Sequence, residues 1–280
     1  MLGLRSLGLK TDLLVPSICG EVHDRGAFIS VRTPSNPGFI WGNFLVFRSP
    51  PEKGDLPRWE EAFRSEFSEL PEVRHQAFTW DEPGLPRPVP PEFTAAGFEV
   101  EPSSVLTASR LRPAPHPNKE VHIRPLASAP DWEAATRNQI RCRGEGWEAA
   151  AYGRFKLRQM HAYRTVAEAG HGSWFGAFVG RRLVGDLGIF KVGGLGRYQS
   201  VGTDPDYRRR GVCAALVHAA GRHALEKLGS RTLVILSGPG SAADRVYRSL
   251  GLRPTQSLVG VFRLTPRPQA RTRTSQGPAG

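Results

Sequence analysis

A junction suited to phosphate is the feature of this sequence that most directly predicts chemistry. Three consecutive arginines precede Gly211, and apolar residues at helical spacing follow it. The first turn of a helix leaves backbone N–H groups without partners and carries about half a positive charge, so it binds anions. Glycine permits close approach of the backbone, and guanidinium groups pair with phosphate oxygens. We therefore predict a pyrophosphate site formed by Arg208, Arg209, Arg210, Gly211, Val212, Cys213 and Ala214.

The elements around this junction predict a sheet flanked by helices. Apolar periodicity and Gly or Pro breaks divide the second half of the chain into strands and helices. The expected strands are residues 121–126, two arms of a hairpin within 173–190, 197–203, 231–237 and 256–264, and the expected helices are 131–140, 147–169, 212–228 and 242–251. This order is typical of an α/β or α+β domain.

Together these features resemble the GNAT superfamily of N-acetyltransferases. The pattern Arg208-x-x-Gly211-x-Cys213 follows a predicted strand, and a Tyr-x-x-x-Gly unit begins at Tyr247. The resemblance covers about residues 119–265 and implies a GNAT-type fold, which is a mixed, mainly antiparallel sheet flanked by helices. It also implies acetyl-CoA as cosubstrate, with its pyrophosphate on the arginine junction. The acetyl group would pass directly to a primary amine through a tetrahedral intermediate.

Two positions depart from the family pattern. Cys213 stands where the family has glycine or alanine, and Gly240 stands where it often has an asparagine that contacts the cofactor, a contact that Ser241 could make instead. A thiol at a helix N-terminus beside arginines should have a lowered pKa, which would permit catalysis through an acetylated cysteine. We favour direct transfer, because the resemblance places this position against the pyrophosphate and away from the thioester.

The resemblance also assigns roles to one side chain and one strand. Tyr247 matches a tyrosine that lies near the CoA sulfur and protonates the leaving thiolate as general acid. The alternative is an ordinary aromatic side chain packed on the sheet. The strand 197–203 matches one that parts from its neighbour, here 231–237, and leaves backbone groups unpaired. An amide there can stabilise the oxyanion of the thioester carbonyl, so the further cofactor-binding candidates are Val201, Gly202 and Thr203.

No general base stands out in the sequence. An amine acceptor is mostly protonated at neutral pH, so a carboxylate or a water relay must remove a proton. Asp186 on a predicted strand and Glu145 in a Gly-Glu-Gly turn are the candidates. Asp186 can instead pair with an arginine, and Gln199 can order a water molecule.

The first half of the chain repeats a short sequence pattern of the second half. Aromatic and glycine residues recur at the same spacing at Phe93 and at Tyr247, after a similar order of elements. The preceding elements are expected at residues 39–47 (strand), 56–70 (helix) and 73–80 (strand). The corresponding junction has no glycine pattern and contains prolines, at positions 50, 51 and 57. We interpret this half as a duplicated, degenerate GNAT-like domain that has lost cofactor binding, packs on the catalytic domain and walls the acceptor cleft.

Proline-rich segments predict the domain boundaries. Residues 1–110 are expected to form the smaller, degenerate α/β domain, residues 111–118 a linker, residues 119–265 the GNAT N-acetyltransferase domain, and residues 266–280 a disordered basic tail. The net charge of +12 lies in the second half, since residues 1–118 carry −3 and residues 119–264 carry +12. A basic surface can bind nucleic acid, but the aromatic residues do not alternate with the basic ones as a stacking platform requires.

The remaining features exclude several classes of protein. No apolar run is long enough to cross a bilayer, and the N-terminus does not resemble a signal peptide. The three cysteines have no metal-ligand spacing and are too few for a disulfide framework, so we expect a cytoplasmic protein without a metal. A non-catalytic CoA-binding or regulatory module is the alternative to an enzyme. The acceptor amine, whether on a small molecule or a protein, and the oligomeric state stay open.

Overall fold

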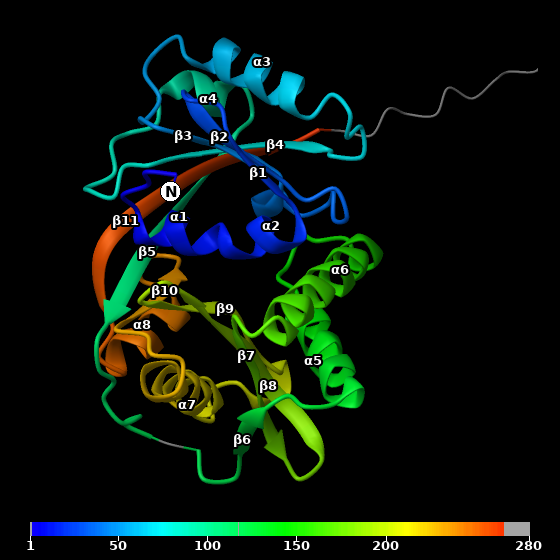
Figure 1. The fold of residues 1–280 in the computed structure, drawn as a ribbon, viewed down its shortest axis with the longest axis vertical. Coiled ribbons are helices and arrows are strands. Elements are labelled where there is room, and N and C mark those ends of the chain that lie inside the picture. The colour runs from blue at the N-terminus through cyan, green and yellow to red at the C-terminus, as the bar shows by residue number, and fades with distance from the viewer. Residues whose placement is uncertain (1, 117, 266–280) are drawn as a thin grey trace, which may run out of the picture.

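The computed structural model describes residues 2–116 and 118–265, which form one sheet with helices on both faces (Figure 1). The helices are α1 (Leu7–Asp12), α2 (Leu14–Cys19), η1 (Ile40–Gly42), α3 (Leu56–Glu66), α4 (Pro91–Ala95), α5 (Ala129–Arg141), α6 (Ala149–Glu168), η2 (Pro205–Tyr207), α7 (Val212–Glu226) and α8 (Ala242–Ser249), with η1 and η2 being 3-10 turns. The strands are β1 (Glu21–Asp24), β2 (Phe28–Arg32), β3 (Phe44–Phe47), β4 (His75–Trp80), β5 (Glu99–Ala108), β6 (His122–Pro125), β7 (Gly172–Val179), β8 (Arg182–Val192), β9 (Leu195–Thr203), β10 (Thr232–Ser237) and β11 (Arg253–Leu264).

The two halves of the chain exchange their final strands within this sheet. Its order is β1-β2-β3-β4-β11-β5-β10-β9-β8-β7-β6. Strand β11 pairs with β4 on one side and with β5 on the other, while β5 also pairs with β10. Figure 1 shows these two long strands running side by side between the halves. Each half therefore completes the sheet of the other, and the predicted division into domains at residues 111–118 stays a prediction.

The order of elements repeats between the halves. The series β3, α3, β4, α4, β5 recurs as β9, α7, β10, α8, β11. The strand pairs β3 with β4 and β9 with β10 are parallel, and the other ladders among the described residues are antiparallel. The sheet is therefore mixed and mainly antiparallel, as the GNAT-type fold requires.

Helices cover both faces of the sheet where it contains β8. Strand β8 is buried along almost its whole length, which is expected when both faces are covered. In the second half, α7 and α8 pack on one face around Leu216 and Tyr247, and α5 and α6 pack on the other around Trp174. In the first half, α3 packs on the sheet through a cluster of aromatic rings that includes Trp59 and Phe93.

Several predicted elements differ from those observed. Residues 39–47 were expected as one strand, but Ile40–Gly42 forms a 3-10 turn. A Cβ on Gly42 would lie 2.2 Å from the Phe39 ring, so glycine is needed there. The side-chain amide of Asn43 donates to the carbonyl of Phe39 at 3.0 Å, and these side-chain contacts close the turn. The helix expected to reach residue 70 ends at Glu66. Helices α1 and α2 and strands β1 and β2 were not predicted, and the expected disordered tail lies outside the described residues.

None of the helices in the described part of the chain is both long enough and apolar enough to span a membrane.

Candidate functional site

The predicted phosphate junction forms the N-terminus of α7. Gly211 is the N-cap residue and has a φ of 75°, in the left-handed region that glycine adopts without strain. A Cβ at this position would also lie 2.4 Å from the carbonyl oxygen of His116, so a second constraint requires glycine. Among the residues that the structure describes, no group accepts a hydrogen bond from the amides of residues 209–214. The local geometry therefore leaves a row of amides that fits a phosphate.

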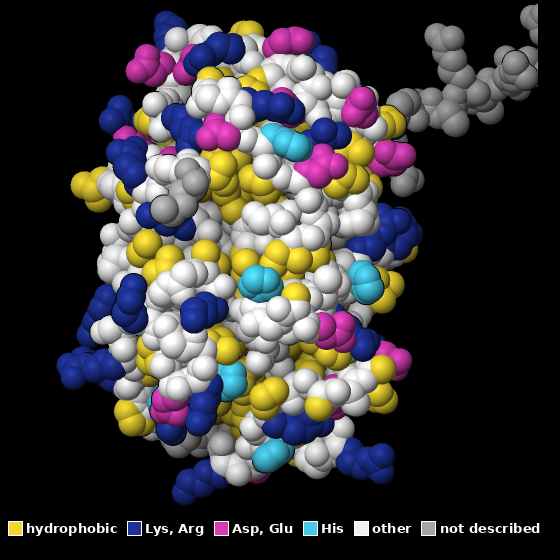
Figure 2. All heavy atoms as spheres, in the orientation of Figure 1, with side chains coloured by type: hydrophobic (Ala, Val, Ile, Leu, Met, Phe, Trp, Pro, Cys, Tyr) yellow, Lys and Arg dark blue, Asp and Glu magenta, His cyan; other side chains and the backbone are white. Residues whose placement is uncertain are grey.

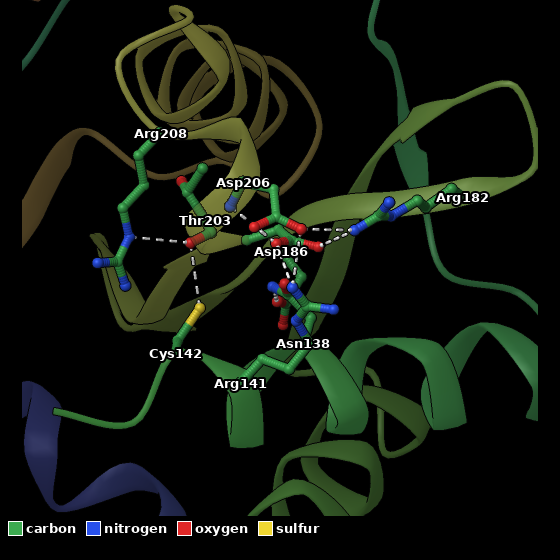
Figure 3. Close-up of polar contacts among 9 residues, drawn as sticks. Asn138, Arg141, Cys142, Arg182, Asp186, Thr203, Asp206 and Arg208 are labelled. Carbon is green, nitrogen blue, oxygen red and sulfur yellow. Dashed lines mark hydrogen bonds and ion pairs between the residues drawn. The ribbon is translucent and has the colours of Figure 1, made fainter.

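The three arginines of the junction are exposed, and two of them, Arg208 and Arg210, contact other groups of the protein. The Nε of Arg208 donates to the carbonyl of Thr203 at 3.4 Å, and Figure 3 shows Cys142 reaching the same oxygen. The guanidinium groups of Arg210 and Arg182 each lie 5.1 Å from the centre of the Tyr207 ring. Contacts within the protein therefore hold part of the basic rim in place.

Two aspartates reduce the positive charge at one side of this rim. Asp204 accepts from Arg141 at 3.1 Å and from Arg182 at 2.9 Å, and Asp206 contacts the same two arginines (Figure 3). On the face shown in Figure 2, Lys and Arg side chains are spread from end to end and do not gather over one element. That face therefore offers no continuous basic track for nucleic acid.

Strands β9 and β10 part at the predicted place. They pair only over residues 195–197 and 232–234. Beyond these positions, the edge of β9 that faces β10 has no ladder partner among the described strands, and this stretch contains Val201, Gly202 and Thr203. The ladder of β9 with β8 also shifts register at this point, and Ser200 has a positive φ of 46°. The strand therefore bulges where it leaves its neighbour.

Buried amide side chains hold this bulge in place. The Nε2 of Gln139 donates to the carbonyl of Ser200 at 2.6 Å and to Asp186 at 3.0 Å. A Cβ on Gly202 would lie 2.7 Å from the same nitrogen, so glycine is needed for Gln139 to reach the bulge. The hydroxyls of Tyr163 and Ser200 lie 3.2 Å apart and fix the other side.

Asp186 is part of this support and is fully buried. It accepts hydrogen bonds from Asn138, Gln139 and Trp174, and not from an arginine. Burial raises its pKa to about 7, although these donors and the charge of Lys156 oppose the shift. It does not line the cavity between the two halves of the chain. This placement indicates a structural role, so the assignment of Asp186 as base stays a prediction that the geometry does not support.

We expect Asp186 to make stability depend on pH. Its pKa of about 7 in the folded protein exceeds the value of about 3.9 for an unfolded chain. Its contribution to folding is therefore fully present below pH 4 and is lost as the pH rises through 7. Relative to Asp186→Asn, the wild type should lose about 1 kcal/mol or more of unfolding free energy between pH 5 and 7.5. Urea unfolding at both pH values measures this difference, and parallel profiles would contradict it.

Tyr247 and Cys213 lie on neighbouring helices beside the junction. Tyr247 is 4% exposed on α8, and burial raises the pKa of its hydroxyl. Cys213 in the first turn of α7 packs against the apolar cluster that contains Tyr247. The expectation of a lowered thiol pKa is wrong, because burial raises the pKa of Cys213 to about 11. Desolvation outweighs the helix terminus, and Cys213 is therefore a thiol at neutral pH.

A cavity of about 270 Å³ lies between the two halves of the chain. Gln199, Ser200 and Leu236 line it where β9 and β10 part. Tyr198 faces α7, since its hydroxyl donates to the carbonyl of Val217 at 2.9 Å. Side chains alternate along a strand, so the neighbours of Tyr198 point to the opposite face, where the cavity lies. The gap between β9 and β10 therefore separates the α7 junction from this cavity.

The first half supplies much of the cavity wall, including two carboxylates. Asp12 from α1 lines the cavity and pairs with Arg197 at 2.6 Å. Glu101 from β5 lines it too and accepts from the indole of Trp41 at 2.9 Å. Sequence reasoning missed these residues, because no motif or spacing connects them to the junction. Glu145, the other predicted base, is exposed in a turn and does not line the cavity.

The corresponding junction in the first half is filled by a side chain of the protein. The carboxylate of Glu92 accepts from the amide of Gly54 at 2.9 Å and from that of Leu56 at 3.4 Å, where α3 begins. A carboxylate at a helix N-terminus takes the position that an anionic ligand would occupy. This contact excludes phosphate there unless Glu92 moves, which agrees with the interpretation of a degenerate half.

Comparison with known proteins assigns the second half to a family. Residues 132–252, from α5 to the end of α8, match the model of the Acetyltransferase (GNAT) family. The second half contains a GNAT domain. Members of this family are acyl-CoA-dependent N-acyltransferases. The sequence matches no curated protein.

Solved structures share the fold of the GNAT domain and of the half that precedes it. A conserved protein of unknown function from Staphylococcus epidermidis has a TM-score of 0.71 and 13% identity, and the match covers 89% of this chain and 96% of that one. A GCN5-related N-acetyltransferase from Kribbella flavida has a TM-score of 0.65 and 18% identity, with 93% and 96% covered. A tandem GNAT protein of the clavulanic acid biosynthesis pathway has a TM-score of 0.50 and 12% identity, with 80% and 74% covered.

Proposed function

We propose that the protein is an acetyl-CoA-dependent N-acetyltransferase that acetylates a primary amine by direct transfer. The observation that carries this proposal is the parting of β9 and β10 between an open helix N-terminus on one face and a cavity on the other. A thioester that passes through this gap from the α7 side would contact an amine bound in the cavity. The GNAT family of the second half supports acyl transfer in general, and the acetyl group is our specific proposal.

In this proposal, acetyl-CoA binds at the α7 junction on one face of the sheet, and the amine approaches from the cavity on the other face. The amides of residues 209–214 and the arginine rim would hold the pyrophosphate. The unpaired edge of β9 near Val201 would bind the carbonyl oxygen of the thioester and stabilise its negative charge during attack. The attacking amine would lose its proton through a water relay, since neither Asp186 nor Glu145 lines the cavity. Tyr247 would protonate the departing thiolate, and burial keeps its hydroxyl protonated at neutral pH. Bound acetyl-CoA supplies the activated acetyl group.

We also propose that the first half is a degenerate GNAT-like unit that walls the acceptor cleft. Its support is the repeated element order, the Glu92 carboxylate at its own junction, and its contribution to the cavity wall. A cytoplasmic location completes the proposal, since all three cysteines are free thiols. Among the described residues, no group of three or more His, Cys, Asp and Glu side chains could hold a metal ion.

Release of free thiol from acetyl-CoA, measured with a panel of small amines, tests the proposal. We expect amine-dependent thiol release and an acetylated product that is heavier by one acetyl group. Acetyl-CoA binding in calorimetry without thiol release from any amine would instead favour a CoA-binding regulatory module.

A further inference from the structure

Arg197 is a buried cation with unused hydrogen-bonding capacity. It lies on β9, lines the cavity, and is 6% exposed. Its Nη2 binds Asp12, while Nε and Nη1 are buried and have no partner among the described residues. A guanidinium carries five N–H donors and stays charged at every physiological pH. Because buried donors without acceptors are unfavourable, this group is suited to a ligand with acceptor oxygens.

The unpartnered N–H donors of Arg197, and not the net charge of the cavity wall, favour a carboxylate as that ligand. Asp12 and Glu101 are the other charged residues of the cavity wall, and Glu101 already binds Trp41. The neighbours of Arg197 on the same face, Gln199 and Tyr163, are neutral. A carboxylate can accept two parallel N–H bonds from a guanidinium, whereas an amine cannot accept any when protonated.

The position of Arg197 relates this anchor to the reaction. It lies two residues before Gln199 on β9, which corresponds to about 7 Å along a strand, and just before the bulge at Ser200. A short molecule with its carboxylate on Arg197 can therefore present an amine near the gap between β9 and β10.

The cavity is small, and the larger part of its wall is apolar. Its wall includes Leu9, Val15, Phe39, Phe44 and Leu258. A volume of about 270 Å³ holds a small molecule, and ligand pockets commonly begin near 300 Å³. A folded protein could not enter it.

We propose that the acceptor is a small amino acid-like molecule with an apolar body, whose carboxylate binds Arg197 while its amine faces the gap between β9 and β10. This inference rests on the proposed function and adds a substrate class to it. Arg197 then determines specificity by binding a group of the acceptor that does not react.

Matched pairs of compounds with and without the carboxylate test this inference. The pairs are L-leucine with 3-methylbutylamine and L-phenylalanine with 2-phenylethylamine, measured by thiol release from acetyl-CoA. The wild type should favour the amino acid at least tenfold in kcat/KM. In Arg197→Gln this ratio should fall to near one, and in Arg197→Lys, which keeps the charge but loses the planar fork, it should be intermediate.

Arg222→Gln serves as the matched control, because Arg222 forms an exposed ion pair with Glu226 on α7, away from the cavity. It should keep the wild-type ratio. Equal use of both members of each pair by the wild type, or a preference that survives Arg197→Gln, overturns the inference.

Failure of the proposed function can be distinguished from failure of this inference. If no compound releases thiol, calorimetric titration of the two amino acids into the protein alone decides the question. Binding that is lost in Arg197→Gln and kept in Arg222→Gln supports the carboxylate site, and absence of binding to the wild type overturns it. Thermal unfolding of each variant shows whether a loss arises from misfolding.

Discussion

Replacement of Tyr247 by Phe is expected to lower kcat on the order of 100-fold while acetyl-CoA binding is kept. The substitution removes only the hydroxyl, and a positioned general acid contributes roughly 10²–10⁴ in rate. The ring would still fill its place in the apolar cluster between α7 and α8. Stopped-flow or steady-state measurement of thiol release, with calorimetry of acetyl-CoA binding, separates the two effects.

Tyr198→Phe is the matched control for this experiment. Tyr198 is 2% exposed in the same cluster, and its hydroxyl donates to the carbonyl of Val217. Loss of this bond should cost about 0.5–1.5 kcal/mol of unfolding free energy and leave kcat within a factor of about three. If both variants reduce kcat equally, or if Tyr247→Phe keeps wild-type turnover, Tyr247 is a packing residue and the assignment as acid fails.

Replacement of Gly211 by Ala is expected to weaken acetyl-CoA binding at least tenfold. The φ of 75° costs an alanine about 1–2 kcal/mol, and its Cβ would lie 2.4 Å from the carbonyl of His116. Relief of this contact must move the first turn of α7 or the segment before residue 117. The amides that we assign to the pyrophosphate would then lose their common direction. Calorimetric titration of acetyl-CoA measures the change.

Gly229→Ala distinguishes loss of the site from general strain. Gly229 follows the other end of α7 and has a φ of 66°, and a Cβ there would meet nothing closer than 3.6 Å. Both variants should lose stability through the backbone, but only Gly211→Ala should lose cofactor affinity. Equal affinity in the two variants would remove the support for the junction as the pyrophosphate site.

The interpretation of the two halves as a duplication has a structural consequence. Because β5 lies between β10 and β11, and β11 lies between β4 and β5, neither half can be removed without exposing strand edges in the other. The cavity is also shared, with Asp12 from one half bound to Arg197 from the other. The first half therefore contributes to the cavity that we propose as the acceptor site, even though its own junction is occupied by Glu92.

The sequence by itself determined the features that depend on neighbouring residues. Apolar periodicity located α5 to α8 and β7 to β11 within a few residues. The Gly211 junction could be predicted because a strand, a break and a helix follow one another directly in the sequence. The resemblance to GNAT proteins rests on the same local pattern. Such signals are readable because a helix N-terminus or a turn is formed by residues adjacent in the chain.

Tertiary structure alone decided which distant residues meet. Asp12 and Arg197 are far apart in sequence, and no local pattern predicts their pairing or the exchange of β5 and β11. The pKa of Cys213 also could not be predicted from neighbouring residues. Its position in the helix predicts a lowered pKa, but burial raises the pKa of the thiol to about 11. Desolvation and strand pairing depend on the whole packed chain, because the free energy of a buried charge or an unpaired edge is set by what surrounds it.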